Sequence, residues 1–182
     1  MKSEYPSSNS KIHIEVLPRI DTNSPPQAIL NMLDEFKDEY LLQEGDELWM
    51  VIDRDKQSWT EATISGIASL CNQKGYLLAL SNPAFEIWLL LHVKNLSEYS
   101  DTDKTRLLEN RKVNRSRTYL EQELFNICGS YNKKNPNLND FLPNIAIAIS
   151  RAEALIENEN ERWPNYLGTH VYRLVKRIIS FQ

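Results

Sequence analysis

The sequence predicts an α/β fold in which helices sandwich a parallel sheet, followed by a mostly helical C-terminal half. Residues 47–53 and 76–80 form short apolar runs, which are typical of strands that are covered on both faces. Segments with a helical spacing of apolar residues, 28–42 and 60–74, precede these two runs along the chain. Because strands that alternate with helices favour parallel pairing, we expect helices on both faces of the sheet.

A further strand and further helices are predicted from local patterns. Residues 12–16 alternate between apolar and other side chains at the period of a strand. Ser24 is the expected N-cap of the helix at 28–42, with proline in its first turn. Pro83 is expected at the first position of the next helix. The remaining predicted helices are 84–93, 116–128, 144–159 and 169–181.

Length and composition limit the class of protein. The 182 residues suit one domain, with an α/β core at about residues 11–93 and a helical part at about 94–182. Five scattered glycines exclude a glycine-rich phosphate-binding loop, which needs clustered glycines. Two isolated cysteines form no zinc or disulfide pattern, so we expect a location in the reducing cytoplasm. No apolar run approaches the ~20 residues of a membrane span, and no membrane partner is expected.

The strongest single signal is a pair of acids at the end of the run 47–53. Asp53 and Asp55 are two residues apart and would point to the same side where the strand leaves the sheet. Ligand sites of open α/β sheets lie at these carboxyl ends. Two close carboxylates repel each other unless a cation such as Mg2+ neutralises them, and such a site suits phosphoryl chemistry. The structural alternative is a turn with a helix N-cap.

A second polar cluster surrounds a strongly apolar predicted helix. Ser81, Asn82 and Pro83 form the turn before it, while Glu86 lies in its first turn and His92 near its end. Glu86 is a candidate third carboxylate, and His92 a candidate acid or base. The structural alternatives are a helix-dipole contact for Glu86 and a hydrogen-bonded core position for His92. Ser81 lacks the glycines of a nucleophile elbow, which argues against a serine hydrolase.

The charge is unevenly distributed although the net charge is only −4. Residues 1–61 carry 13 acids against 6 bases, whereas residues 104–117 carry six bases against one acid. A basic segment of this kind suits the backbone of a nucleic acid, and its structural alternative is a solvated face. The residues expected to contact nucleic acid are Arg54, Arg111, Lys112, Arg115 and Arg117.

Several motifs occur together in the order and approximate spacing of a known family. They are Val51-Ile52-Asp53-Arg54-Asp55, the run from Ser81 to His92, Tyr131 with Lys133, and the run from Gly168 to Val175. On these motifs the chain resembles the RloB-like family, and the resemblance covers essentially the whole sequence. It implies a Toprim-like core, as in topoisomerase-primase domains, and genes near restriction-modification and other anti-phage loci.

The resemblance also implies roles for individual residues. Asp53 and Asp55 would be the paired acids that bind Mg2+. Glu86 and His92 would be additions to the same pocket, and Lys133 a phosphate contact. The resemblance further implies a larger, ATP-driven partner protein from the same defence locus.

One departure from the family pattern concerns the N-terminus. The pattern opens with a strand and a Glu-Gly-x-x-Thr/Ser-Glu turn, whose first Glu completes the metal site. The run from Met1 to Tyr5 resembles only the tail of that turn, with Glu4 as its second acid and candidate metal ligand. We expect either a true start further upstream, which we favour, or the loss of a catalytic ligand.

These observations lead to three hypotheses about function. The leading one is a Mg2+-dependent Toprim-type nuclease, or another phosphoryl-transfer enzyme acting on DNA or RNA, in phage defence. The second is a non-catalytic subunit that binds nucleic acid or a partner protein through the basic segment. The third is an enzyme that uses the same acids on a free nucleotide.

Overall fold

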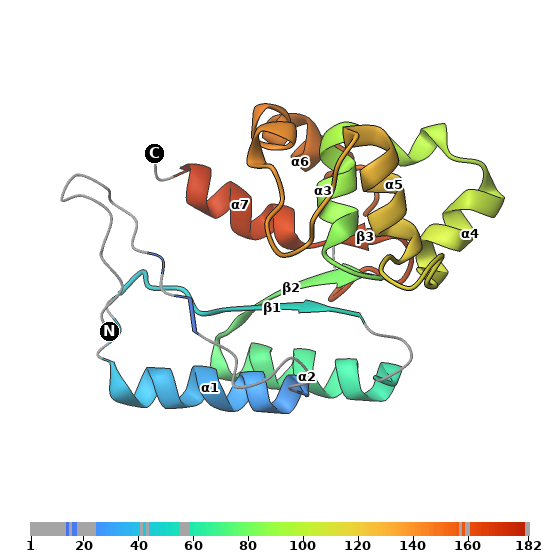
Figure 1. The fold of residues 1–182 in the computed structure, drawn as a ribbon. Coiled ribbons are helices and arrows are strands. Elements are labelled where there is room, and N and C mark those ends of the chain that lie inside the picture. The colour runs from blue at the N-terminus through green and yellow to red at the C-terminus, as the bar shows by residue number, and fades with distance from the viewer. Residues whose placement is uncertain are drawn as a thin grey trace.

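The computed structural model describes residues 25–40, 44–54, 59–156 and 161–180, with the isolated positions 14, 16, 17, 42 and 158. The order of elements is α1 (Pro26–Glu39), β1 (Trp49–Asp53), α2 (Glu61–Lys74), β2 (Leu77–Asn82), α3 (Glu86–Val93), η1 (Leu96–Glu98), α4 (Asp101–Glu109), α5 (Tyr119–Cys128), η2 (Leu138–Asp140), η3 (Leu142–Asn144), α6 (Ile145–Glu153), β3 (Gly168–Thr169) and α7 (Val171–Ser180). A small sheet separates α1 and α2 from the other helices (Figure 1). The predicted α/β class is confirmed.

The sheet has the strand order β1-β2-β3 in the described part of the chain. β1 and β2 pair in parallel, with Trp49 opposite Leu77 and Asp53 opposite Ser81. Helix α2 connects these two strands, so the predicted parallel pairing is confirmed. β3 was not predicted, and it pairs with the end of β2 in the antiparallel sense. The helix expected at 169–181 therefore begins only at Val171.

Two apolar cores lie on the two faces of the sheet. The lower core includes Leu30, Met50, Ile52, Ile64, Ile67 and Leu80, and the upper core includes Ala79, Ile87, Leu90, Leu107, Leu120 and Ala148. The prediction that β1 is covered on both faces is wrong, because Val51 is 42% exposed between Met50 and Ile52. The reason is topological: β1 is an edge strand of the described sheet, and α3 and α7 pack against β2.

The ends of the first two helices follow the local sequence. Helix α1 begins at Pro26 and has Pro25 as its N-cap residue, so proline in the first turn is confirmed. Ser24, the expected cap, lies outside the described residues. Helix α2 has Thr60 as its N-cap and ends at Gly75, whose φ of +75° is left-handed and favours glycine.

Other predicted elements differ in the structure in their type or in their ends. In the predicted strand 12–16, positions 14 and 16 belong to no strand and are 55% and 78% exposed, while the others lie outside the described residues. Pro83 does not start a helix, since α3 begins at Glu86. The helices expected at 116–128 and 144–159 are shorter, starting at 119 and ending at 153 respectively. No helix within the described ranges is long and apolar enough to cross a membrane.

Candidate functional site

Two parallel strands end side by side at one edge of the sheet. β1 ends at Asp53 and β2 ends at Asn82, with Asp53 opposite Ser81. The backbone N–H of Arg54 donates to the carbonyl oxygen of Ser81 at 2.7 Å, so the pairing continues one residue beyond β1. This is the edge at which open α/β sheets bind their ligands.

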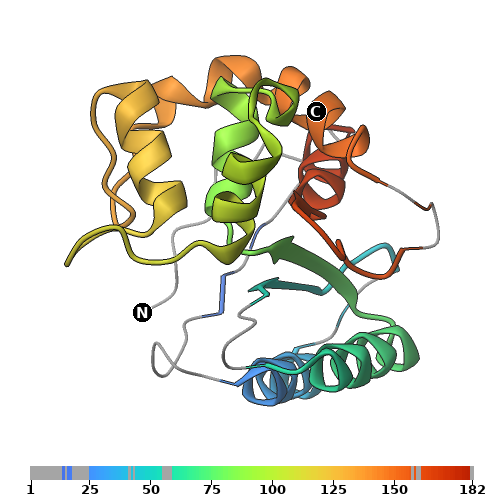
Figure 2. The same cartoon turned by 90° about the vertical axis from the view of Figure 1, so that its right-hand side faces the viewer.

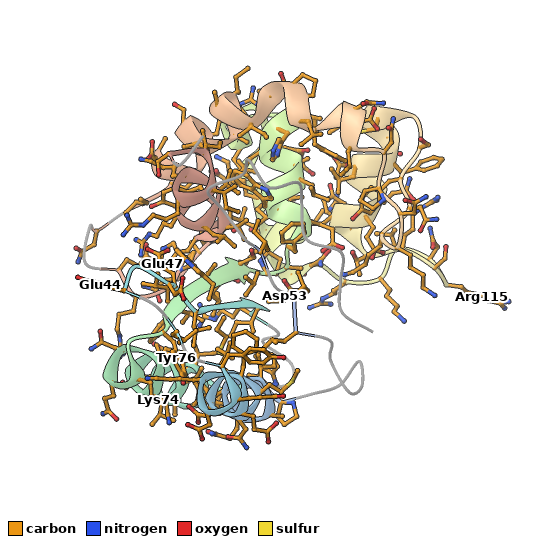
Figure 3. All side chains as sticks on the ribbon, turned by 90° about the vertical axis from the view of Figure 1, so that its left-hand side faces the viewer. Glu44, Glu47, Asp53, Lys74, Tyr76 and Arg115 are labelled. Carbon is orange, nitrogen blue, oxygen red and sulfur yellow. The ribbon has the colours of Figure 1, made fainter. Side chains whose placement is uncertain are left out.

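Asp53 is fixed against the start of α3. Its Oδ1 accepts a hydrogen bond at 2.7 Å from the backbone N–H of Phe85, the N-cap residue of that helix. The carboxylate therefore lies at the positive end of the helix dipole. Figure 3 shows Asp53 at the end of β1, facing the helices of the upper layer. Asp53 thus caps a helix, as the structural alternative held, but the helix is the one that follows β2.

Glu86 is a buried carboxylate in the first turn of α3 and is only 2% exposed. Its Oε1 lies 2.8 Å from the Nζ of Lys133 and accepts a hydrogen bond from the hydroxyl of Tyr131 at 3.4 Å. Lys133, which was predicted to contact a phosphate, is therefore paired with Glu86 in the structure, and its phosphate contact stays a prediction. The Lys133 side chain is 58% exposed, so it joins the buried acid to the surface.

The buried carboxylate of Glu86 shifts the pKa values of Lys133 and Tyr131. Burial lowers the pKa of Lys133, but the hydrogen bond and charge of Glu86, with the charge of Asp53, outweigh it, and the pKa is raised overall. Burial, together with the charge of Glu86, raises the pKa of Tyr131. Lys133 is therefore positively charged and Tyr131 protonated at neutral pH, and both lie within electrostatic reach of Asp53.

A groove of about 400 Å3 opens beside Asp53. It is lined by Asp53, Arg54, Pro83, Ala84, Leu108, Glu109, Asn110, Arg111, Lys112 and Thr118. The groove joins the ends of the two parallel strands to residues 108–118 of the helical half. Its volume lies in the range of ~300–1,000 Å3 that is typical of ligand sites. The structure thus brings the predicted acid and three of the predicted bases to one surface.

Two of the groove bases are already engaged by neighbouring oxygens. Arg54 Nη1 donates to the backbone carbonyls of Pro164 and Asn165 at 3.4 and 3.2 Å. Arg111 Nε lies 3.2 Å from Glu109 Oε2, and both of these side chains are largely exposed. Exposed pairs of this kind are weak, so a phosphate is able to compete for Arg111.

The other predicted bases belong to a short hairpin that leads into α5. Lys112 lines the groove and forms an antiparallel bridge with Thr118. Arg115 is exposed beyond the groove, and the guanidinium of Arg117 stacks 3.9 Å from the ring centre of Phe125. Of the predicted bases in this segment, Arg111 and Lys112 therefore line the groove, whereas Arg115 and Arg117 lie outside its wall.

Of the predicted polar turn Ser81-Asn82-Pro83, only Pro83 lines the groove, and Ser81 and Asn82 are the last two residues of β2. Ser81 Oγ lies 2.8 Å from Thr169 Oγ1, and Asn82 Nδ2 donates to the carbonyl of Pro164 at 2.9 Å. Both side chains are buried, at 1% and 0% exposed. Ser81 and Asn82 therefore hold β3 and the segment before it against β2.

His92 lies in the upper core, away from Asp53. Its Nδ1 is 2.9 Å from the carbonyl oxygen of Trp88, and its ring meets the rings of Trp88 and Phe141 edge to face. Burial lowers the pKa of His92. His92 lies seven positions after Phe85, which corresponds to about 10 Å along the helix axis. The structure thus does not bring His92 to the acid at the start of α3.

The predicted metal site is only partly covered by the described residues. Asp55 and Glu4 lie outside them. Within the described ranges, no three acid, histidine or cysteine side chains converge as a ligand set. Mg2+ usually takes one or two carboxylates and keeps several waters. Asp53, in the groove wall, therefore fits as one such ligand, whereas Glu86 is already paired with Lys133.

Some groove residues were not singled out by the sequence interpretation. Asn110 and Thr118 line the groove and fix the two ends of the hairpin, since Asn110 Oδ1 accepts the N–H of Leu120 at 2.9 Å. Thr118 forms a capping box with Glu121. The Thr-x-x-Glu spacing is a visible signal for that cap. Asn110 ends α4 with a left-handed φ of +44°, and asparagine is one of the residue types that commonly end helices.

The fold and the site define an α/β protein whose candidate site combines an acid at a strand end with a basic groove. The family model described as RloB-like protein matches residues 2–178, and the chain belongs to the RloB-like family. Comparisons with curated proteins and with solved structures find no match.

Proposed function

We propose that this protein is a Mg2+-dependent nuclease with a Toprim-like site that cuts nucleic acid in the cytoplasm. The observation that carries the proposal is the groove in which Asp53 lies beside Arg54, Arg111 and Lys112. An acid that holds a hard cation, next to bases that hold a phosphate backbone, is the combination that phosphodiester cleavage needs.

The residues of the site have distinct roles in this proposal. Asp53, with Asp55, would hold Mg2+, which when bound polarises a phosphate and lowers the pKa of a water. Arg111 and Lys112 bind the phosphates of the substrate strand on the other side of the groove. Lys133 pairs with Glu86 and adds positive charge near Asp53. We leave His92 out of the reaction because its ring lies in the core.

The cellular setting is part of the proposal and is supported by family membership. We propose action in anti-phage defence, at loci of the restriction-modification type, together with an ATP-driven partner protein. A partner of that kind supplies movement along nucleic acid, while this chain supplies the cutting site.

The test is cleavage of supercoiled plasmid DNA and of a structured RNA by the full chain, with Mg2+ or with EDTA. Asp53→Asn is the informative variant, because an amide oxygen still accepts the N–H of Phe85 while the charge is lost. We expect it to reduce cleavage about 100-fold or more. Asp101→Asn is the matched control, since the Asp101 side chain is fully exposed on α4. Equal cleavage by both variants would show that the acid assignment is wrong.

A second candidate function is a non-catalytic nucleic-acid-binding subunit. The specific observation in its favour is that the groove wall contains Arg54, Arg111 and Lys112. Cationic side chains of this kind can hold a phosphate backbone without any metal. This candidate predicts binding that weakens with salt and is unchanged by EDTA, with no cleavage by the parent. A cleavage assay and a binding assay, each with Mg2+ or with EDTA, therefore separate the two functions.

A further inference from the structure

Residues 111–119 form a projecting β-hairpin between α4 and α5. The N–H of Val113 donates to the carbonyl of Arg117 at 3.0 Å, and the N–H of Tyr119 donates to the carbonyl of Arg111 at 2.9 Å. Lys112 and Thr118 form the antiparallel bridge between these two hydrogen bonds. The hairpin extends away from the body of the protein beside α5 (Figure 2).

The tip of the hairpin is held by one side chain. Asn114 Oδ1 accepts hydrogen bonds from the N–H groups of Ser116 and Arg117, both at 2.9 Å, and from the Ser116 hydroxyl at 3.0 Å. At the base, Asn110 and Thr118 cap the adjoining chain. The hairpin is therefore a defined arm that orients its side chains.

The arm is basic and carries no acid from residue 110 to 118. Within the described residues, neither Lys112 nor Arg115 forms an ion pair with an acid. Arg115 lies at the outer end, far from the body of the protein (Figure 3). Val113, which is 47% exposed, adds an apolar side chain near the tip. These are features of a surface that binds a polyanion and also contacts bases.

Arm and groove form one continuous surface, since Arg111, Lys112 and Thr118 at the base of the hairpin line the groove that contains Asp53. None of the lining residues that the structure describes is aromatic. Single-stranded nucleic acids are usually held by aromatic side chains on which bases stack. The groove therefore suits a phosphate backbone whose bases are already stacked in a duplex.

We infer that the hairpin enters the major groove of B-form DNA and places the adjacent phosphate next to Asp53. The inference rests on the proposed function and specifies its substrate class. Neighbouring strands lie about 4.8 Å apart, so a two-stranded ribbon with its side chains fits the ~12 Å major groove of B-DNA. The major groove of A-form RNA is deep and narrow and closed to such a ribbon. Arg115 reaches the base edges, while Arg111 and Lys112 contact phosphates.

The experiment measures binding of the full chain carrying Asp53→Asn, in EDTA, to a fluorescent 20-base-pair DNA duplex, its single strand and an RNA duplex of the same sequence. We expect the DNA duplex to bind about tenfold more tightly than the other two. Arg115→Ala, at an exposed position, should weaken duplex binding about fivefold or more and reduce the preference for duplex. Lys112→Ala should lower the salt slope by about 1.

Two further variants test whether binding depends on the place of a positive charge and on the shape of the hairpin, or only on the total charge of the protein. Lys74→Ala removes one positive charge from α2, which lies on the other side of the sheet, and should leave binding unchanged (Figure 1). Asn114→Ala removes no charge and should weaken binding about twofold to tenfold with an unchanged salt slope, because it loosens the tip.

The inference is overturned if Arg115→Ala and Lys112→Ala bind like Lys74→Ala, or if single-stranded DNA or duplex RNA binds as tightly as duplex DNA. Hairpin-dependent binding without cleavage by the parent chain would leave the inference intact and refute the nuclease. Cleavage that is unaffected by Arg115→Ala would do the reverse.

Discussion

The two ends of α3 have opposite surroundings, although both belong to one apolar run of sequence. At the start, Glu86 pairs with Lys133, and Asp53 accepts the N–H of Phe85 beside an open groove. At the end, His92 is 4% exposed among aromatic rings. A polar residue of this motif therefore lies near the groove only if it is at the end of the helix that meets the edge of the sheet.

The difference has a physical cause. The start of α3 adjoins the carboxyl ends of two parallel strands, where backbone N–H groups and the helix dipole favour negative charge. The rest of the helix packs against α5 and α6 in the upper core. A neutral imidazole is favoured there, because burial opposes its protonation.

The largest expected change in stability comes from the buried end. His92→Ala removes a ring that packs between two aromatic residues, and should lower the free energy of unfolding by about 2–4 kcal/mol. Urea denaturation measures this loss. Cleavage per folded molecule should equal that of the parent at low urea. A selective loss of cleavage in a fully folded variant would show that His92 does take part in the site.

Acid should destabilise the protein through its buried imidazoles. Burial, aided by the charge of Arg173, lowers the pKa of His170 to about 4, and burial lowers the pKa of His92 as well. Since an unfolded histidine titrates near 6.5, the unfolded state binds more protons below that pH, and stability falls as pH falls. His170 alone should remove about 2 kcal/mol between pH 7.5 and 5. Urea denaturation across this range measures it, and a flat profile would contradict the burial of these rings.

Breaking the ion pair at the start of α3 should have a smaller effect. Lys133→Met leaves the buried carboxylate of Glu86 without its cation, although Tyr131 still donates to it. We expect a loss of about 1–2 kcal/mol, because the Lys133 side chain is itself largely in solvent. Glu86→Gln in the Lys133→Met background should recover part of it in thermal unfolding. No recovery in the double variant would show that Lys133 contributes only packing.

The smallest change is expected at Arg54. Arg54→Ala removes two hydrogen bonds to the carbonyls of Pro164 and Asn165, and should cost about 0.5–1 kcal/mol. Its effect on DNA affinity should be larger than its effect on stability, in contrast to His92→Ala. Equal losses of DNA affinity and of stability in Arg54→Ala would show that the groove at the start of α3 is no more specialised for binding than the core at its end.

The sequence predicted the parts of the fold that depend on local pattern. The parallel strands, the helix between them and the position of Asp53 at a strand end follow from apolar runs and from the glycine that ends α2. β3 was missed because a strand of two residues has no periodicity of its own, and it is defined by the contact of Thr169 with Ser81.

The sequence predicted which residue types lie near the end of β1, but not the contacts that they make. Acid and bases do meet in one groove, since the sheet and the helical half converge there. The partner of Glu86 was not predicted from spacing, because 47 positions separate it from Lys133 and only the tertiary fold brings them together. His92 was placed near a reacting group because its motif is continuous in sequence, whereas the helix carries it into the core.

The location of a bound metal ion by NMR tests directly whether Asp53 is a metal ligand. Mn2+, which takes the same oxygen ligands as Mg2+, broadens the signals of nearby nuclei. We expect stronger broadening of the backbone amides of Phe85 and Glu86 than of the more distant ring of His92, and loss of this broadening in Asp53→Asn. Broadening centred on His92, or a pattern unchanged by Asp53→Asn, would contradict this assignment.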